Sequence, residues 1–417
     1  MNERTNATET GERPRVLIAG GGIAGLEAAL ALRDLAPEET DVALVAPEPD
    51  FVLKPLVVEE PFTHQPPERH ELEPLLEEIG ARYVRGALYR LDPEAHVLRL
   101  GSGADLSYDV LVVCVGGRAR PAYRNAETFW STTGDLPVDR LIHEARHSQG
   151  CTLALVVPPG TSWPLPLYEL ALLARRRSEE LGLDELRLRL LTPEHRPLLI
   201  FGSRASDAVA ALLAARRISV ETDSSVIEDE GGELHVVPSG APVRAGVVLS
   251  LPLIEGPRVS GLPADPHGFT PVDEFGRVEG VADVYAAGDG TDFPVKQGGL
   301  ATQQADAAAE HIAARLGARL DPSPFRPHLR GQLITGAESL HMAHELSGGH
   351  GEGMASLDYL WWPPQKVAGR YLSAWLGHEA PRADLEPRLR PLEVELSWPH
   401  EWHGEPLSYD AEAPLRR

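Results

Sequence analysis

Runs of consecutive apolar residues that stop at glycines mark the buried strands of this chain. Residues 16–18 are apolar and run into a cluster of glycines, and a helical pattern then covers about 25–35 and stops before Pro37. Parallel strands that are covered on both faces have such continuous apolar runs. The pattern therefore predicts a β-α-β unit over residues 15–45 and a further strand of the same sheet over 110–115.

A second alternation of strands and helices begins after about residue 130. The expected elements are strands at 152–157, 186–191 and 246–251 and helices at 167–177 and 203–217. Such alternation predicts a second doubly wound sheet, inserted into the first. The chain is expected to return to the first sheet around 267–289 and to continue in an alanine-rich helix over 298–316.

These patterns predict an α/β fold made of two Rossmann-like domains and a C-terminal cap. The expected parts are a disordered tail (1–13), a first domain in two pieces (14–130 and 265–330), an inserted domain (131–264) and the cap (331–417). Residues 46–67, rich in proline and acidic residues, are expected to form a loop. In the cap, a helical stretch is expected over 366–376.

A glycine motif stands at the first junction between strand and helix, where Gly20, Gly22 and Gly25 have the spacing GxGxxG. The first glycine allows a tight turn, the second lets the backbone approach a phosphate, and the third lets the helix pack closely. The start of a helix attracts anions. With Ile23 and Ala24, this loop is predicted to hold a pyrophosphate; a glycine-rich turn in another kind of α/β protein is the alternative.

A second motif, Ala-Gly-Asp over 287–289, lies far downstream. Together, the two motifs are typical of the two ends of one FAD site. The first would hold the pyrophosphate and the second the ribityl chain, with Gly288 close to the cofactor and Asp289 hydrogen-bonded to a ribityl hydroxyl. A plain helix cap is the alternative for Asp289.

Composition narrows the possible partners and the location. The chain has 39 basic and 62 acidic residues and a formal net charge of −23, which argues against nucleic acid and against strong attraction to anionic lipid. No apolar run reaches the roughly 20 residues that cross a bilayer. The first dozen residues are polar and do not resemble a signal peptide, so a cytoplasmic location is expected. The two cysteines have no metal-ligand spacing, and no metal site is expected.

The motifs resemble those of the two-dinucleotide-fold flavoproteins, the pyridine nucleotide-disulfide oxidoreductase-like FAD enzymes. Within that group, the type II NADH:quinone oxidoreductases and the sulfide:quinone oxidoreductases look closest. Residues 108–116 resemble the strand YDxLVxATG of these proteins, and 51–56 resemble the segment that they place beside the flavin ring. The resemblance implies FAD, held by Gly20, Gly22, Ile23, Ala24, Gly25, Glu48, Lys54, Pro55, Cys114, Gly116, Gly288, Asp289, Lys296, Gln297 and Gly298.

Three departures from the family pattern concern nucleotide and sulfide chemistry. The loop that would hold a nicotinamide dinucleotide, residues 158–169, keeps only Gly160 and contains prolines, which have no N–H to donate. Tight NAD(P)H binding in the usual mode is therefore disfavoured. Trp163 stands where sulfide:quinone oxidoreductases have a redox cysteine, so a dithiol mechanism is not expected. The acidic residue that usually meets the adenosine ribose is missing from the end of the second strand, where either Glu48 or backbone groups would take its place.

Three residues are the candidates for catalysis. Lys296 precedes the helix at Gly298 and is expected to place a cation near the flavin N1/O2 edge, and Lys54 lies in the flavin-facing segment. They are two of the three lysines in the chain, the third being Lys366. Glu169 aligns with a family glutamate near the flavin and the acceptor, where a raised pKa would suit proton delivery. The alternatives are solvated lysines and a glutamate on a helix surface.

The sequence thus predicts a FAD-dependent oxidoreductase that passes electrons from a small-molecule donor through FAD to a quinone-like acceptor. The pair Gln303 and Gln304 resembles part of a quinone-associated family motif. Two alternatives stay open: an NAD(P)H dehydrogenase with a degenerate nucleotide loop, and a flavin-binding sensor or partner subunit without turnover. The C-terminal region is expected to make a homodimer contact or a peripheral contact with the inner face of a membrane, or to pack as a helix over the flavin domain.

Overall fold

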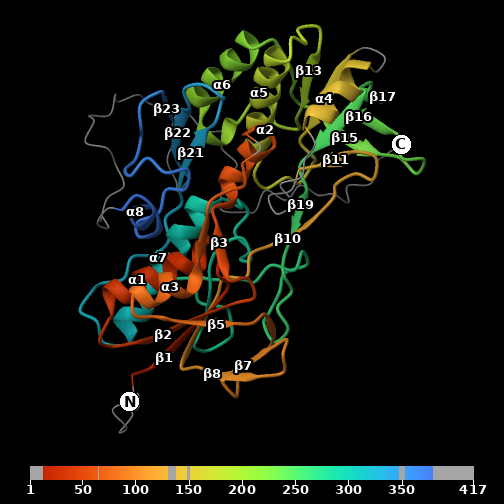
Figure 1. Cartoon of the computed structure of the whole chain (residues 1–417). Coiled ribbons are helices and arrows are strands. Elements are labelled where there is room, and N and C mark those ends of the chain that lie inside the picture. The colour runs from red at the N-terminus through yellow and green to blue at the C-terminus, as the bar shows by residue number, and fades with distance from the viewer. Residues whose placement is uncertain (1–12, 64, 130–137, 148–150, 347–352, 379–417) are drawn as a thin grey trace.

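The computed structural model describes residues 13–63, 65–129, 138–147, 151–346 and 353–378. Figure 1 shows one α/β domain in its lower half, around β1 and α1, and a second in its upper half, around β13 and α5. Of the predicted disordered tail, all but Arg13 lies outside the described residues.

The first domain is built on a parallel sheet with the strand order β20-β9-β1-β2-β5. These strands are β1 (Arg15–Ala19), β2 (Asp41–Ala46), β5 (Arg82–Arg85), β9 (Val110–Val113) and β20 (Val284–Ala286). Because β20 pairs with β9, the Ala-Gly-Asp motif at the end of β20 lies at the same sheet edge as the glycine motif at the end of β1.

Both faces of this first sheet are covered, which explains its continuous apolar strands. One face packs on helices α1 (Ile23–Leu35), α3 (Leu72–Glu78) and α7 (Gly298–Arg315). The other face packs on a three-stranded antiparallel sheet, formed by β6 (Leu88–Asp92), β7 (Val97–Leu100) and β8 (Asp105–Ser107). Helices α1 and α7 pack side by side, so the starts of both helices approach the same sheet edge.

The inserted domain has its own parallel sheet, with the order β11-β18-β12-β13-β14. Its strands are β11 (Glu127–Thr128), β12 (Thr152–Val156), β13 (Arg187–Leu191), β14 (Ile218–Glu221) and β18 (Val247–Ser250). The accompanying elements are α4 (Val138–His147), α5 (Leu165–Glu180), η2 (Leu199–Phe201), α6 (Ser203–Ala215), β15 (Ser225–Glu228), β16 (Leu234–Val237) and β17 (Ala241–Pro242). The predicted α/β class with a second, inserted Rossmann-like sheet is therefore confirmed.

The chain crosses between the two domains through an antiparallel pair, β10 (Arg118–Arg120) and β19 (Leu253–Glu255). Strand β11 follows β10 and already belongs to the second sheet, although the predicted boundary lies at residue 130. The inserted domain thus begins slightly earlier than the sequence pattern indicated, because a two-residue strand is too short to give an apolar signal.

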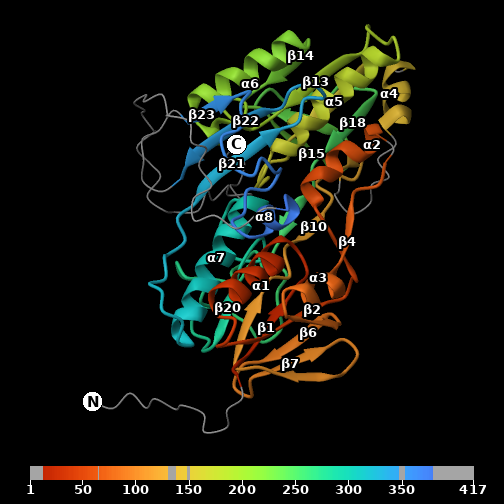
Figure 2. The ribbon, with the colours of Figure 1, turned by 60° about the vertical axis from the view of Figure 1, so that its left-hand side comes forward.

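The C-terminal part contacts both domains (Figure 2). Its antiparallel sheet, β21 (His328–Leu333), β22 (Leu340–Glu345) and β23 (Met354–Ser356), shares a hydrophobic core with the inserted domain. Its short helix α8 (Leu372–Leu376) packs instead against α1 of the first domain. Residues 379–417 of the predicted cap lie outside the described residues.

Two local expectations were wrong. Residues 46–67 contain β3 (Asp50–Val52), which pairs with β4 (Arg69–Glu71), and also η1 (Lys54–Glu59) and α2 (Glu60–Thr63). Apolar side chains such as Phe51, Val57 and Val58 are buried there and order the segment. In the cap, the predicted helix over 366–376 is confined to α8, because the backbone before it is engaged by side chains of α1 and α7.

Candidate functional site

The first glycine loop combines two tight contacts with one open position. Gly20 has a φ of +123°, and a Cβ there would collide with the carbonyl oxygen of Cys114. A Cβ on Gly25 would collide with the carbonyl oxygen of Gly20. At Gly22, by contrast, an added Cβ would meet nothing within 4 Å. The outer glycines therefore fix the loop against its own backbone, while Gly22 leaves space for a ligand.

The start of helix α1 provides donors beside that space. The helix begins at Ile23, its N-cap is Gly22, and no side chain caps it. The first N–H groups of a helix have no partner within the helix, and the helix dipole places positive charge at this end. This is the chemistry that a pyrophosphate requires.

The other predicted FAD residues lie around the same loop. A Cβ added at Gly288 would lie 3.1 Å from the Cβ of Ala24, and one at Gly298 would lie 3.0 Å from the Cδ1 of Ile23. Gly290, directly after Asp289, approaches the carbonyl oxygen of Gly116 in the same way, at 3.2 Å. Segments from four separate parts of the sequence thus meet at one sheet edge.

Asp289 is the polar group of this edge that lacks a partner. Its carboxylate is half-buried and accepts no hydrogen bond from the part of the chain that the structure describes. Burial raises the pKa of Asp289, and the nearby Lys296 and Lys54 oppose that rise. A ribityl hydroxyl would supply the missing donor.

Apolar groups beside this edge are also uncovered. Val115, next to Gly116, is 38% exposed, and Leu56, in η1, is 36% exposed. An added Cβ on Gly116, whose φ is +71°, would again meet nothing within 4 Å. Open glycine faces, free helix donors, an unpartnered carboxylate and exposed apolar side chains together fit a dinucleotide that carries a flat aromatic ring.

Lys296 is buried and is bound to its own loop. Its Nζ donates to the carbonyl oxygens of Thr291 and Phe293, each at 2.6 Å, and lies 3.7 Å from the centre of the Phe269 ring. Burial lowers the pKa of Lys296 to about 8, against the opposing pull of the aspartates around it, with Asp289 the strongest. The lysine therefore braces the loop that carries Asp289, and its predicted place at the flavin edge stays a prediction.

Lys54, Pro55 and Glu48 flank the same region on the surface. Lys54 is the first residue of η1, is exposed, and lies close enough to Asp289 to affect its pKa. Glu48 follows β2, and its side chain is exposed while its carbonyl oxygen accepts from Tyr83 at 2.9 Å. Their contacts with a cofactor stay predictions.

The glutamines around the start of α7 have structural partners. Gln297 caps the helix by accepting from the Leu300 N–H at 2.8 Å. Gln304 accepts from the Gly288 N–H at 2.7 Å, and Gln303 accepts from the His328 N–H at 2.9 Å. The pair that resembles a quinone motif therefore holds the Ala-Gly-Asp turn and strand β21 in place.

Glu169, predicted for proton delivery, is fully buried and paired with Lys366. Both side chains are at most 6% exposed, and Lys366 also donates to the carbonyl oxygen of Gln332 at 2.6 Å. Glu169 accepts a further hydrogen bond from the Ile334 N–H at 2.8 Å. Burial raises the pKa of Glu169, and Lys366 partly offsets the rise. The alternative of a surface glutamate is therefore excluded.

This ion pair lies beside the start of α7. Val367, the residue after Lys366, has its Cγ2 3.0 Å from a Cβ added at Gly298. The pair thus joins α5 of the inserted domain to the end of the first domain where the flavin is expected. Sequence reasoning singled out Lys366 only as one of the three lysines, and nothing in its local pattern indicates its partner.

In the inserted domain, the loop between β12 and α5 offers little to a second dinucleotide. Helix α5 has Pro164 as its N-cap and a further proline, Pro166, in its first turn, so N–H donors are missing where a pyrophosphate would bind. The C-terminal sheet also covers this end: a Cβ added at Gly331 of β21 would lie 3.2 Å from the Cδ1 of Leu165, the first residue of α5. The residues present do not fit a nicotinamide dinucleotide in the usual mode.

The carboxylate at the end of β13 is also engaged. Glu194 accepts from the hydroxyls of Tyr168 at 2.6 Å and Thr192 at 2.9 Å. Burial raises the pKa of Glu194 to about 7, although both hydroxyls act in the opposite direction. In a Rossmann-like domain this strand end faces the nucleotide ribose. Here its acidic group is turned to partners within the domain.

The two cysteines of the chain are free thiols. Cys114 is buried beside the glycine loop, and burial raises its pKa to about 12. The Cys151 thiol donates to the carbonyl oxygen of Arg146 at 3.0 Å. A buried thiol with so high a pKa is a poor nucleophile, which agrees with the expectation that no dithiol reaction occurs.

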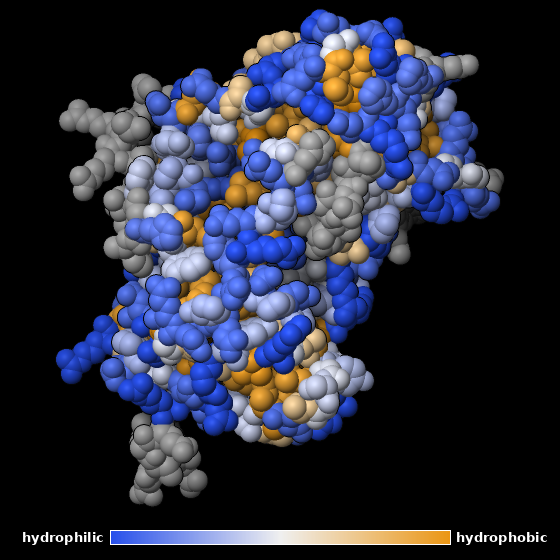
Figure 3. Space-filling model, in the orientation of Figure 1, coloured by the Kyte–Doolittle hydropathy of each residue, from blue (hydrophilic) through white to orange (hydrophobic). Residues whose placement is uncertain are grey.

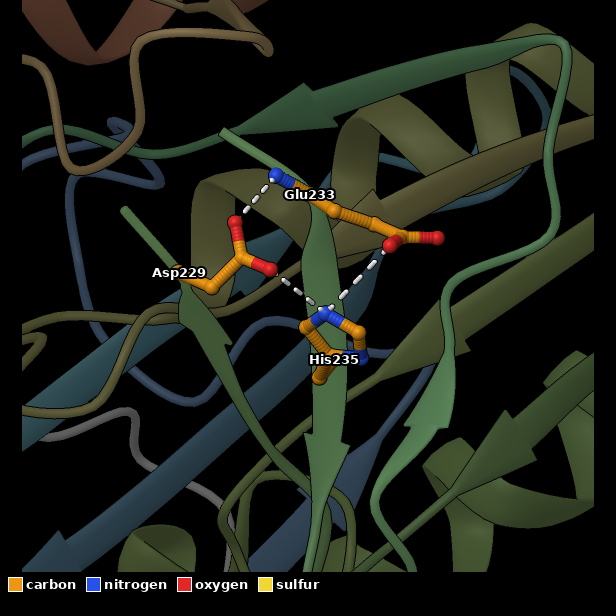
Figure 4. Close-up of side chains that lie close together, drawn as sticks. All are labelled: Asp229, Glu233 and His235. Atoms are coloured by element: carbon orange, nitrogen blue, oxygen red, sulfur yellow. Dashed lines mark hydrogen bonds and ion pairs between the residues drawn. The ribbon is translucent and has the colours of Figure 1, made fainter. Parts of the chain in front are cut away.

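Asp229, Glu233 and His235 gather on the hairpin of β15 and β16 in a way that could hold a metal ion (Figure 4). His235 Nε2 lies 3.2 Å from the Asp229 carboxylate and 3.7 Å from that of Glu233. Asp229 also accepts from the Glu233 N–H at 2.8 Å. These contacts close the hairpin turn by themselves, and the two carboxylates are exposed, so the group is explained as a surface ion pair.

Comparison with known proteins shows what this chain is similar to. Residues 14–145 match the profile of the pyridine nucleotide-disulphide oxidoreductase family. The sulfide-quinone reductase of Aquifex aeolicus is 26% identical over 270 residues, 58% of this chain and 59% of that protein. The alternative NAD(P)H-ubiquinone oxidoreductase C1, chloroplastic/mitochondrial, of Arabidopsis thaliana is 26% identical over 385 residues, 80% of this chain and 73% of that protein.

Among solved structures, the sulfide:quinone oxidoreductase from Aquifex aeolicus superposes with a TM-score of 0.70 at 21% identity, covering 80% of this chain and 84% of that one. At this identity the likeness shows the fold alone. In the sequence comparison, the chain spans less than two thirds of the length of the Aquifex relative.

Residues 14–145 match the family profile, and the fold resembles that of the FAD-binding Rossmann-type oxidoreductases. The predicted resemblance to the pyridine nucleotide-disulphide oxidoreductase-like flavoenzymes is confirmed. Among the described residues, no helix is long and apolar enough to cross a membrane. The face seen in Figure 3 is mostly hydrophilic, with apolar surface visible where the two domains meet.

Proposed function

We propose that this protein is a FAD-dependent oxidoreductase that passes two electrons from a small-molecule donor other than NAD(P)H to a quinone-like acceptor. The observation that carries the proposal is the contrast between an open first nucleotide loop and a covered second one. The printed names of the two sequence relatives both contain a quinone, which supports that class of acceptor.

FAD, when bound, would supply the electron transfer chemistry. Gly22 and the first turn of α1 would hold its pyrophosphate, and Asp289 would accept a hydrogen bond from its ribityl chain. Lys296 keeps the Asp289 loop rigid through its two carbonyl contacts. Gln297 fixes the start of α7, whose free N–H groups and dipole would favour negative charge at the pyrimidine edge.

The buried pair Glu169 and Lys366 supports a role in protonation. Reduction of a quinone to a quinol takes up two electrons and two protons, and a buried site reaches bulk water poorly. The raised pKa of Glu169 suits a group that holds a proton and releases it to a substrate. Lys366 keeps a donor beside it, next to the start of α7.

The donor is proposed to differ from those named for the relatives. The prolines around α5 and the cover by β21 argue against a nicotinamide dinucleotide. The cysteines argue against a dithiol reaction with sulfide, since Cys114 is buried and Cys151 is bound to a carbonyl oxygen.

A half-reaction tests this function without knowledge of the donor. FAD-loaded protein is reduced anaerobically with one equivalent of dithionite and mixed with a water-soluble ubiquinone analogue in a stopped-flow spectrometer. We expect the oxidised flavin band to return at a rate that depends on quinone concentration. In a Glu169→Gln variant, the oxidised flavin band should return more slowly, and its rate should depend less on pH. A flavin that stays reduced in the presence of quinone would contradict the proposal and favour the sensor alternative.

A further inference from the structure

A second buried carboxylate, Glu27, is not explained by the proposed chemistry. It lies on α1, one turn beyond the glycine loop, and is 0% exposed among apolar neighbours. A buried carboxylate is costly unless it is hydrogen-bonded. Glu27 finds its donors in the C-terminal part of the chain: Oε1 accepts from the Tyr371 N–H at 2.8 Å and Oε2 from the Leu372 N–H at 2.6 Å.

Residues 367–372, called the strap below, wrap around this carboxylate. A Cβ on Gly369 would lie 2.9 Å from Glu27 Oε2 and 2.9 Å from Thr302 Cγ2, so a side chain there would displace one of these groups. Thr302 of α7 donates to the carbonyl oxygen of Ala368 at 3.0 Å. Ser373 accepts from the Gly369 N–H at 2.7 Å. The strap is therefore seated on α1 and α7 through polar contacts of its backbone and through the buried side chains of Val367, Tyr371 and Leu372.

A second acid, Asp306, meets Glu27 at the same place. It lies on α7 one turn after Thr302, and its carboxyl group is within hydrogen-bonding reach of Glu27. Its Oδ1 is buried and has no partner among the described residues. Burial raises the pKa of both acids, and for Asp306 the neighbouring Glu27 adds to the rise. Two carboxyl groups in such contact cannot both ionise cheaply.

The charges around the pair are few. Arg370 of the strap lowers the pKa of Asp306, but its guanidinium is also bound to Glu310 of α7 at 3.1 Å. Glu310 acts on Asp306 in the opposite direction. The Tyr371 hydroxyl is buried and neutral, with Asp34 of α1 nearby. Arg370 is therefore shared, and the pair keeps an excess of negative charge that a proton would remove.

We propose that Glu27 and Asp306 share one proton and that this proton keeps the strap seated on α1 and α7, so that the strap is released as the pH rises. With the proton present, Asp306 can donate to Glu27, which stays anionic and accepts both strap N–H groups. When the proton passes to solvent, two adjacent anions repel, and exposure of the pair to water relieves the repulsion.

Release of the strap has a consequence for the candidate acceptor site. Lys366 directly precedes the strap and is held against Glu169 by its position in the chain. Withdrawal of the strap would withdraw Lys366 from Glu169. This link to electron transfer rests on the proposed function, whereas the release itself does not.

Amide hydrogen exchange of the full chain, followed by mass spectrometry between pH 6 and 9.5, tests the release without donor or quinone. After correction for intrinsic exchange, protection of the peptide covering the strap should fall by about tenfold or more across this range. Asp306→Asn keeps a donor beside Glu27 but cannot titrate, so its strap should keep constant protection. Asp34→Asn, an exposed change on α1, should behave like the wild type.

The direction of the pH effect follows from the linkage between proton binding and stability. Because the folded pair has a raised pKa, it contributes stability that is present at low pH and is lost as the pH rises through the folded value. Constant protection of the wild-type strap across the range would overturn the proposal, as would an equal fall in Asp306→Asn. If Asp306→Asn does not fold, the pH dependence of strap protection in the wild type tests the proposal by itself. A released strap with a failed quinone half-reaction would refute the proposed function only.

Discussion

The junctions β1–α1 and β12–α5 occupy equivalent places in two Rossmann-like domains, yet they offer opposite surfaces. The first has three glycines, free N–H donors and open space at Gly22. The second has prolines at the start of the helix and is covered by strand β21. The same strand–loop–helix scaffold therefore fits a dinucleotide in one domain and serves as a packing surface in the other.

The two junctions differ in a small number of backbone N–H donors and in strand β21, which covers only the second junction. The cover comes from the C-terminal part, which packs its sheet on the inserted domain and its short helix on the first domain. The Glu169–Lys366 pair connects helix α5 of the inserted domain to the C-terminal part. The inserted domain thus contributes Glu169 to this buried ion pair, and we propose a nucleotide-binding role for the first domain alone.

The largest expected effect comes from breaking the connection between the domains. Lys366→Met would leave Glu169 buried without its cation, and loss of one partner of a buried pair typically costs about 3–5 kcal/mol. We expect chemical denaturation to show a loss of this size. Arg176 lies on α5, the helix that carries Glu169, and is paired with Glu180 at a half-exposed site. The control variant Arg176→Met should therefore cost less than about 1 kcal/mol of stability. Equal losses in the two variants would show that the buried Lys366–Glu169 pair contributes no more to the free energy of unfolding than a surface ion pair does.

The next largest effect concerns the open position of the first loop. Gly22→Leu has room in the protein but would occupy the space expected for the pyrophosphate. We expect FAD affinity to fall by about 100-fold, close to 2.7 kcal/mol, with an unchanged melting temperature of the apoprotein. Ser162→Leu, in the corresponding loop of the inserted domain, should keep full FAD content. Stoichiometric FAD in purified Gly22→Leu would refute the placement of the site.

A smaller effect is expected at the other end of the cofactor. Asp289→Asn removes the charge of the acceptor and should weaken FAD binding by about tenfold, or 1.4 kcal/mol, measured by fluorescence titration. Asp321→Asn, an exposed change outside the site, serves as the control. An affinity equal to that of the wild type would mean that Asp289 does not contact the cofactor.

The smallest effect is a pH dependence of the flavin potential. Since burial lowers the pKa of Lys296 to about 8, its cation is present below pH 8 and is lost above it. If Lys296 lies near the flavin, the potential should drop by an additional 30 mV or so, about 1.4 kcal/mol for two electrons, as the pH passes 8. Spectroelectrochemistry of Lys296→Met should show no such drop. Lys54→Met, which changes an exposed lysine, should retain it.

Local rules in the sequence were sufficient for the scaffold and the first loop. Continuous apolar strands and the spacing of Gly20, Gly22 and Gly25 depend on neighbouring residues, so the sequence alone predicts the order of elements and the glycine loop after β1. The same holds for the second loop, where Trp163 and the prolines already disfavoured a nucleotide.

Residues that meet only through tertiary packing were missed. Glu27 and Asp306 lie on helices whose sequence patterns are ordinary, and their contact appears only when α1 and α7 are packed together. The predicted helix over 366–376 was wrong before residue 372 for a related reason: the N–H groups of Tyr371 and Leu372 bind Glu27, which lies more than 340 positions earlier in the chain. Likewise, the cover over α5 depends on Gly331, distant in sequence from the loop it closes.

The most direct test of the contrast between the two junctions is an anaerobic stopped-flow experiment on the purified, FAD-containing protein. The protein is mixed separately with NADH and NADPH while the flavin absorption band is followed. We predict that the band persists with both nucleotides, although dithionite bleaches it fully. Rapid bleaching that saturates with NADH or NADPH concentration would show that the second junction binds a nicotinamide dinucleotide and would contradict the assignment of nucleotide binding to the first domain alone.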